Sequence, residues 1–463
     1  MTPKELPKEL NELGVQALAL HKARNFAEAE PLYLRMIAAA PDNPLPRHYL
    51  GILKAQTGRH ADAADLLASA LRLKPDAPDT LFHHAHVLRR LGRAAEALAD
   101  CDRLLALRPD HAAGLNQRGS ALQALKRYSE ALASYDHALA LKPDYGEAIY
   151  NRATVLHELD RYQEALAGYD AALAMAPRHA GALHRRGAVL HRLGQWEAAL
   201  DSLDRALAAR PDHADALRDR GRVLWAMHRI AEGFDSLRRI TAQRDTEEDA
   251  RLDGPAINPL HAGQAWPDSG PRILVLDDIL TPPALEALRR LCRDSTVWRA
   301  APEDGLAFAV PESGFAAPLL AQIAGELRAA LPAVFQDHPL LHLEAARHDG
   351  DAEAAAPRRE GAAVSVHLWL TPDDANRDPD HGGLLVWDTP VPEGGLVPFQ
   401  GDAAMARKYL AAGGAQPITI PWRANRAVLL AAGLAQETDA IRFGDGPENR
   451  RASVTMRYGR ASS

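Results

Sequence analysis

A period of 34 residues constrains the first half of this chain more than any other feature of its sequence. Six prolines recur at this spacing, and aspartate follows five of them: Pro41, Pro75, Pro109, Pro143, Pro177 and Pro211. Because proline lacks a backbone N–H and disfavours helix in the residue before it, each one separates two helical units. Self-similarity at a fixed period of this length predicts a stacked array of repeats.

Small residues keep the same period in two further series. The first series is Ala17, Gly51, Ala85, Gly119, Ala153, Gly187 and Gly221, and the second is Ala29, Ala63, Ala97, Ala131, Ala165, Ala199 and Gly233. Large residues occupy a third phase at Phe26, Tyr128, Tyr162 and Trp196. Small residues let two antiparallel helices approach closely, and large residues fill the gaps beside them. The pattern predicts pairs of helices that stack on their neighbours as a solenoid.

These units resemble the tetratricopeptide repeat family, with six full repeats over about 10–213 and a degraded seventh to about 245. The resemblance implies an all-helical solenoid whose concave groove binds a protein or peptide. The groove residues expected on the inner helices are His48, Phe82, Asn116, Tyr150, His184 and Arg218, with a second row of Arg89, Gln123, His157, His191 and Trp225. The alternatives are a merely solvated face and a metal site. The metal site is disfavoured because residues one repeat apart lie too far from each other to share an ion.

Composition limits the class of partner and the compartment. The net charge of −7 gives no support to a nucleic-acid partner or an anionic membrane. No apolar run approaches the ~20 residues that span a bilayer, and the first ten residues lack the apolar core of a signal peptide. The two cysteines, Cys101 and Cys292, are far apart and exclude a disulfide framework. We therefore expect a cytoplasmic protein.

The period ends near residue 245, which predicts a multidomain α + β chain. Residues 1–245 form the solenoid, residues 246–272 are a connector rich in Pro, Gly and charge, and residues 273–463 form a second domain. In that domain we expect a strand over 273–280, a helix capped by Thr281 and another helix over about 318–331. Short alternating segments predict strands over 362–371, 382–389, 418–422, 425–432 and 452–459.

Three segments of the second domain carry a further resemblance: VLDDILTPPALEAL, AAVSVHLWLTPDDANRDPDHGGLLVWD and NRAVLLAAGLAQETDAIRFGDGPENRRASVTMRYG. Over about 270–460 they resemble the 2-oxoglutarate- and Fe(II)-dependent oxygenases, and most closely the prolyl-hydroxylase-like branch found fused to tetratricopeptide repeats in bacteria. The resemblance implies a double-stranded β-helix, or jelly roll, with flanking helices. It also implies an iron held by a His-x-Asp pair and a distal histidine, with open positions for 2-oxoglutarate and oxygen.

The positions that align with the iron ligands hold other residue types. The His-x-Asp pair aligns with Arg358 and Glu360, and the distal histidine aligns with Gln436. Arginine is always cationic and has no acceptor atom, and a glutamine amide is a poor ligand for Fe(II). One carboxylate among three positions will not hold iron, so we expect no catalytic residue, no metal and no cofactor.

Other residues bear on the same pocket. His367 lies seven residues after Glu360, and this odd spacing in a regular strand predicts that it points to the opposite face. His348 and His381 are expected in loops. Arg450 and Arg451 match the family position that pairs with the distal carboxylate of 2-oxoglutarate, and the spacing does not decide which of them faces the pocket.

The sequence therefore predicts a peptide-binding scaffold with a degenerate oxygenase-like domain, a pseudoenzyme. The alternative is an active 2-oxoglutarate-dependent dioxygenase that hydroxylates a peptide recruited by the repeats. A third reading, a different enzyme in the old pocket, lacks any nucleophile–base pair or phosphate loop to support it. Metal binding by the purified protein separates the first two.

Overall fold

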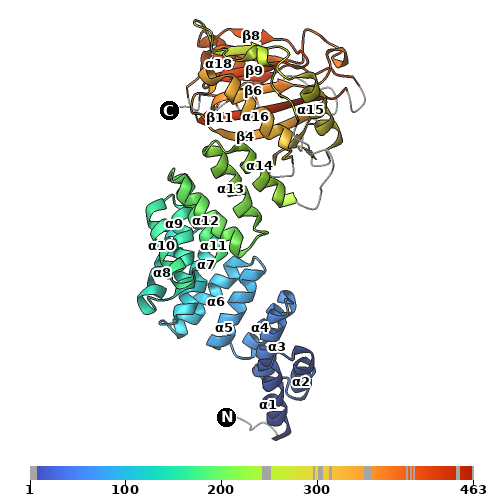
Figure 1. Cartoon of the computed structure of the whole chain (residues 1–463). Helices are drawn as coiled ribbons and strands as arrows, with labels where there is room; N and C mark the ends of the chain where they lie inside the picture. Colours follow the sequence, from blue (N-terminus) through green and yellow to red (C-terminus); the bar gives the residue numbers. More distant parts are fainter. Residues whose placement is uncertain are drawn as a thin grey trace. The chain divides into compact units, whose positions relative to one another are not determined.

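The computed structural model describes residues 8–241, 252–295, 298–300, 306–311, 315–348, 356–359, 361–392, 395–396, 399, 402–444 and 449–460. The chain divides into two compact units, Met1–Leu193 and Gly194–Ser463. Figure 1 follows the chain from helices to a sheet-containing domain. Among the described helices, none combines the length and the apolar composition that crossing a bilayer requires.

Helices follow one another in pairs, one pair for each 34-residue period. The first unit contains α1 (Lys8–Lys22), α2 (Phe26–Ala39), α3 (Pro44–Gln56), α4 (His60–Leu73), α5 (Pro78–Arg90), α6 (Ala94–Leu107), α7 (Ala112–Ala124), α8 (Tyr128–Leu141), α9 (Gly146–Glu158), α10 (Tyr162–Met175) and α11 (Ala180–Arg192). The second unit begins with α12 (Trp196–Ala209), α13 (Ala214–Ala226) and α14 (Ile230–Arg238). The predicted helical repeats are confirmed, and the seventh pair is helical as well.

The small residues of the repeats lie where two helices of a pair touch. A Cβ atom added to Gly119 of α7 would lie 2.6 Å from the ring of Tyr135 in α8. In the same way, a Cβ on Gly51 of α3 would lie 2.7 Å from the side chain of Leu67 in α4. Ala131 and Tyr135 are completely buried in this core. The periodic small residues therefore set the distance between paired helices.

The second unit continues with two antiparallel sheets and their covering helices. Its elements are β1 (Ile273–Leu276), α15 (Pro282–Asp294), β2 (Arg299–Ala300), β3 (Leu306–Ala309), α16 (Pro318–Ala330), α17 (Pro332–Phe335), β4 (Leu340–His348), β5 (Arg358–Arg359), β6 (Ala362–Trp369), β7 (Leu384–Pro390), α18 (Ala403–Ala412), β8 (Pro417–Ile420), β9 (Ala427–Ala431), β10 (Leu434–Thr438) and β11 (Arg451–Arg460). The order of strands is β1-β9-β6-β11-β4-β3-β2 in the larger sheet and β5-β10-β7-β8 in the smaller one. The predicted strands and both predicted helices are present.

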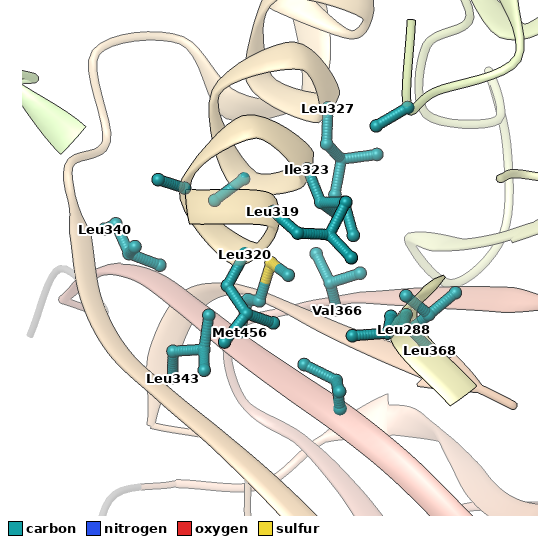
Figure 2. Close-up of a cluster of buried hydrophobic side chains, with 14 of the residues drawn as sticks. Leu288, Leu319, Leu320, Ile323, Leu327, Leu340, Leu343, Val366, Leu368 and Met456 are labelled. Carbon is teal, nitrogen blue, oxygen red and sulfur yellow. The ribbon is translucent and has the colours of Figure 1, made fainter. Parts of the chain in front are cut away.

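The larger sheet has one apolar face and one polar face. Leu320 and Ile323 of α16 and Leu288 of α15 pack on Val366 and Met456, which Figure 2 shows from close by. Alternation along each strand sends the intervening side chains to the other face, toward the smaller sheet. The two sheets meet through a second cluster that contains Trp369, Val386, Ile420, Trp422 and Leu434 among others.

The described part of the predicted connector is fastened to α16. Both Ala256 and Ile257 donate their backbone N–H groups to Glu326 Oε2, at 2.6 and 3.0 Å. The amide of Gln322 donates to Gly254 O at 2.8 Å and accepts from Leu252 N at 3.0 Å. Residues 252–257 therefore belong to the core of the second unit, and helices α12–α14 fall in that unit too.

Thr281 precedes α15 as predicted, but its hydroxyl does not cap the helix. The Oγ1 atom donates to Pro255 O at 2.8 Å, and no side-chain cap bond to the helix is made. The expected cap is therefore wrong. Helix α15 instead begins with two prolines, whose fixed φ favours the first turn.

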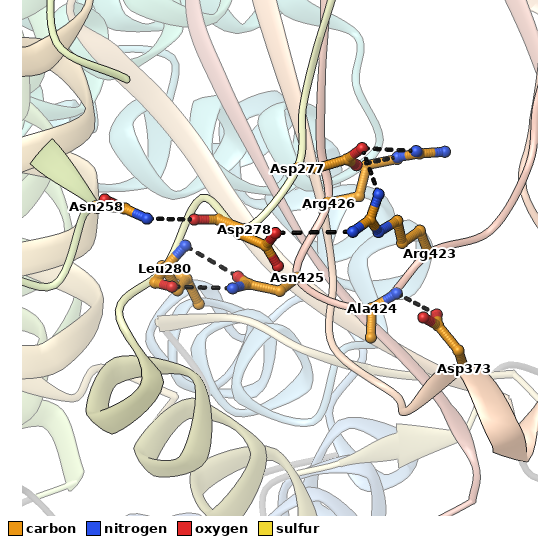
Figure 3. A network of polar contacts seen from close by, with 9 residues as sticks. All are labelled: Asn258, Asp277, Asp278, Leu280, Asp373, Arg423, Ala424, Asn425 and Arg426. Atoms are coloured by element: carbon orange, nitrogen blue, oxygen red, sulfur yellow. Dashed lines mark hydrogen bonds and ion pairs between the residues drawn. The ribbon is translucent and has the colours of Figure 1, made fainter. Parts of the chain in front are cut away.

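Polar contacts fix the loop after β1 to the loop before β9 (Figure 3). The Asn425 side chain donates to Leu280 O and accepts from Leu280 N, each at 2.9 Å. Asp277 accepts from Arg426 Nε at 2.5 Å and from Arg423 Nη1 at 2.9 Å. These contacts join segments about 145 residues apart in sequence and hold the edge of the larger sheet.

Candidate functional site

Two regions contain the residues predicted to be functional. The first is the row of first helices in the repeats, and the second is the space between the two sheets. In the row, Phe82, Tyr150, His157, His184, His191 and Arg218 are partly exposed, whereas His48 and Asn116 are buried. Trp225 is only 2% exposed and packs on Phe234, so it is a core residue, not a surface one.

His48 is held by the next repeat. Its Nδ1 atom lies 2.9 Å from Thr80 Oγ1, and its ring meets the ring of His83 edge to face, with the centroids 5.6 Å apart. Burial lowers the pKa of His48, and burial together with the neighbouring His48 and His86 lowers the pKa of His83 to about 4. These imidazoles are therefore neutral at pH 7, and they can donate or accept hydrogen bonds.

Asn116 also contacts the repeat that follows it. Its Oδ1 atom accepts from Asn151 Nδ2 at 3.0 Å, and its Nδ2 atom donates to Tyr145 OH at 3.4 Å. Tyr150 packs against His179 of the next repeat, with ring centroids 5.1 Å apart. Residues at this position therefore link successive first helices, a structural task that the spacing alone does not reveal.

Three polar atoms in the central repeats are buried without a hydrogen-bond partner among the described residues. They are Arg89 Nε on α5, Gln117 Oε1 on α7 and His157 Nδ1 on α9. Gln117 is only 8% exposed. Arg89 and His157 were predicted for the second row. Gln117 was missed, although it stands 34 residues before Asn151 and next to Asn116. A buried polar atom without a partner is uncommon in a folded protein and marks a place where an outside group can bind.

Between the sheets, the structure brings together two of the three positions aligned with iron ligands. Gln436 on β10 and Arg358 on β5 are direct cross-strand partners. Ala435 packs toward α18 and Glu437 pairs with Arg407 of α18 at 3.1 Å, so Gln436 points the other way, toward the larger sheet. Glu360 lies outside the described residues.

His367 lies on the inner, polar face of the larger sheet. Trp369, two residues on, packs against the smaller sheet, and His367 Nδ1 is 3.4 Å from Thr455 Oγ1. The predicted orientation relative to Glu360 assumed one regular strand. That assumption is wrong, because β5 and β6 belong to different sheets. His348 ends β4 and pairs with Arg451, so it is a strand residue and not a loop residue. His381, in contrast, does lie outside the strands.

A charged pair occupies the same inner face. Glu344 of β4 accepts from Arg457 Nη1 of β11 at 2.9 Å and lies 3.3 Å from His342 Nε2. Burial alone would raise the pKa of Glu344, but His342 and Arg457 outweigh it and lower the pKa to about 2. The carboxylate is therefore ionised and already paired.

The two arginines that open β11 have different surroundings. Arg451 is 4% exposed, donates from Nε to Gly382 O at 3.0 Å and lies over the ring of Trp422 at 5.1 Å. Burial lowers its pKa to about 10, so it stays cationic at neutral pH. Arg450 instead lines a cavity beside α15. Of the two, Arg451 is the one beside the sheet-to-sheet core.

These side chains do not fit an iron centre. Arg358 offers no acceptor atom, and the buried group at Gln436 is an amide. Within the described part of the chain, no three His, Cys, Asp or Glu residues gather closely enough to hold a metal ion. The inner face offers amide, hydroxyl, imidazole and guanidinium groups, which suit hydrogen bonding to a polar or anionic group.

Comparisons with known proteins concern the helical half. One tetratricopeptide repeat family model matches residues 144–212, and a second matches residues 50–112, 82–146 and 184–248. No curated protein matches the chain.

Solved structures with a similar arrangement include a tetratricopeptide repeat protein from Parabacteroides merdae. It is 20% identical with a TM-score of 0.44, over 52% of this chain and 96% of that one. YrrB, described as a tetratricopeptide repeat protein with an unusual peptide-binding site, is 23% identical with a TM-score of 0.34, over 40% and 95%. MamA from Desulfovibrio magneticus is 15% identical with a TM-score of 0.36, over 38% and 99%. On the family matches, residues 50–248 of this chain are tetratricopeptide repeats.

Proposed function

We propose that the repeats bind an extended peptide or protein segment along their first helices. We further propose that the sheet domain is a double-stranded β-helix of the 2-oxoglutarate oxygenase type that has lost its iron site. In this proposal the protein is a binding scaffold with a pseudoenzyme domain.

The observation that carries the peptide proposal is the set of buried polar atoms without partners in the central repeats. Arg89 Nε is a donor, Gln117 Oε1 is an acceptor, and His157 Nδ1 can be either. The backbone of an extended peptide presents donors and acceptors along its length and can satisfy groups of both kinds. A merely solvated face would not require these atoms to be shielded from water.

The test selects a binding peptide from a random library with the full-length chain and measures its affinity by calorimetry. Gln117→Leu and Arg89→Met should each weaken the selected peptide by about tenfold, because a buried hydrogen bond is lost in the complex. The control is Arg127→Met, an arginine on the turn before α8 that pairs with Glu130 at 2.7 Å. Unchanged affinity in both groove variants, or an equal loss in the control, would contradict the proposal.

Strand order supports the jelly-roll part of the proposal. Leaving aside β1, β2 and β3, eight strands remain in two sheets, ordered β4-β11-β6-β9 and β5-β10-β7-β8. Numbered from one to eight along the chain, these orders are 1-8-3-6 and 2-7-4-5. The alternation of successive strands between two facing sheets is the arrangement expected of a jelly roll.

The loss of iron binding is proposed from the chemistry at Arg358 and Gln436. Calorimetry with Mn(II), a redox-silent substitute for Fe(II), should detect no specific site in the full-length chain. An assay for succinate formed from 2-oxoglutarate should stay at background. Succinate above background, or metal binding that Glu360→Ala abolishes, would instead support the alternative, an active dioxygenase acting on a peptide bound by the repeats. The triple change Arg358→His, Glu360→Asp and Gln436→His should create metal binding if the pocket is otherwise kept.

A further inference from the structure

A cavity of about 220 Å³ lies beside α15, on the apolar side of the larger sheet. Four arginines line it: Arg289 and Arg293 from α15, Arg347 from β4 and Arg450 from the residue before β11. Among the described residues of its wall, the one carboxylate is that of Glu286. The wall therefore carries an excess of positive charge, although the whole chain has a net charge of −7.

Two of these arginines are held in place by neutral groups. Arg289 Nε donates to Leu370 O at 2.6 Å, and the guanidinium of Arg347 lies over the Trp298 ring at 4.7 Å. The Trp298 indole in turn donates to Cys292 O at 3.0 Å, which fixes the ring. A carbonyl and an aromatic face orient a guanidinium but leave its positive charge in place.

Thr371 fixes the remaining wall. Its hydroxyl donates to Arg450 O at 2.6 Å and accepts from Ala452 N at 2.8 Å. The start of β11 is thus tied to the end of β6, with Arg450 on the cavity side and Arg451 buried on the other side. This cavity is therefore separate from the polar space between the sheets, and it does not depend on the oxygenase resemblance.

We propose that this cavity binds a small phosphate-bearing anion through Arg289, Arg347 and Arg450. Planar guanidinium groups match the oxygen spacing of a phosphate and can donate two hydrogen bonds each. The volume of about 220 Å³ is below the ~300–1,000 Å³ of pockets that enclose a drug-sized ligand. It suits inorganic phosphate or the phosphate end of a small metabolite.

Calorimetry on the full-length chain tests the proposal with inorganic phosphate, sulfate, succinate and chloride at constant ionic strength. Phosphate should bind with a Kd of about 1 mM or tighter. Sulfate should bind more weakly, and chloride should not compete. Tighter binding of succinate than of phosphate would overturn the phosphate assignment, because succinate carries two carboxylates with a different geometry.

Variants locate the site. Arg289→Gln and Arg450→Gln should each weaken phosphate binding by about tenfold or more, because a charge-assisted contact is lost. Arg290→Gln is the matched control, since Arg290 neighbours Arg289 on α15 but does not line the cavity. Circular dichroism verifies the fold of each variant, and Arg450→Gln keeps the test valid if Arg289→Gln fails to fold. No phosphate binding, or binding that neither variant weakens, would overturn the proposal.

Discussion

The helical repeats and the sheet domain of this chain are stabilised by contacts of different range. In the repeats, each helix packs on the helices next to it in sequence, such as α7 on α8 and α8 on α9. In the sheet domain, neighbours in space are distant in sequence, as where Leu276 pairs with Ala427 and Arg451 pairs with His348. A repeat array can therefore lose one contact and keep the others, whereas a sheet of distant strands folds or fails as a whole.

The largest effect is expected at Gly383, just before β7. A Cβ atom there would lie 2.0 Å from the backbone oxygen of Ile420 and 2.9 Å from Trp422 N. Because backbone atoms cannot rotate away, Gly383→Ala should separate β7 from β8 and cost roughly 4 kcal/mol or more. Thermal unfolding followed by tryptophan fluorescence should show the sheet transition lost or strongly lowered.

The control for this change is Gly325→Ala, in helix α16 of the same unit. No atom lies within 4 Å of its added Cβ, and alanine favours helix, so stability should rise by up to about 1 kcal/mol. A sheet transition that is unchanged in Gly383→Ala would mean that the close pairing of β7 and β8 does not hold the domain together.

In the repeats, the corresponding change is Gly119→Ala. Its Cβ would lie 2.6 Å from the ring of Tyr135, which is fully buried, so overpacking should cost about 3 kcal/mol. Hydrogen exchange should accelerate in α7, α8 and their neighbours and stay slow in the sheets. Gly146→Ala is the control, because its Cβ would meet only Met175 at 3.5 Å. Loss of protection throughout the chain would contradict the local character of the array.

The sequence predicted the helical half well because every repeat gives the same information again. It could not tell which residues of the first-helix row are used within the protein. His48 and Asn116 were predicted to face a ligand, but Thr80 and Asn151 of the following repeats bind them. Such contacts depend on how far one repeat rotates relative to the next, and spacing does not encode that rotation.

In the sheet half, alternation found the strands with β-branched residues but missed β4 and β10. The segment LLHLEAARH of β4 contains three charged or histidine residues on its inner face, and LAQET of β10 is short. Whether His367 and Gln436 lie between the same sheets depends on which sheet each strand joins. That choice is made by pairing between distant segments, so it could not be predicted from local pattern.

An intermediate effect is expected from acidification of the repeats. Burial and the nearby His48 and His86 hold the pKa of His83 at about 4, below its ordinary 6.5, while Asp79 opposes them weakly. The unfolded chain therefore binds a proton more readily, so this contribution is full above about pH 6.5 and is lost as the pH falls toward 4. The loss should reach roughly 2 kcal/mol. Urea titrations should show a flatter pH profile for His83→Gln, and an identical profile would refute the role of this residue.

The smallest effect is expected from the periodic ion pairs on the surface of the repeats. Asp102 accepts from Arg118 Nε at 2.6 Å, and the same contact recurs 34 residues later between Asp136 and Arg152 at 2.6 Å. These pairs are part-exposed, so solvent and salt screen them, and Asp102→Asn should cost less than about 1 kcal/mol. Because Arg118 also donates to Ser134 at 2.8 Å, the arginine stays anchored in this variant.

Glu344→Gln provides the comparison in the sheet domain, since its pair with Arg457 is largely shielded from water. Removing one partner of a shielded pair leaves a charge that solvent cannot reach, and the loss should exceed that of Asp102→Asn. Urea unfolding at low and high salt measures both. The loss in Asp102→Asn should shrink as salt is added, whereas the loss in Glu344→Gln should change little. If both variants responded equally to salt, the two halves of the chain would not differ in how their charges are shielded, and the contrast between a periodic surface and a buried polar layer would fail.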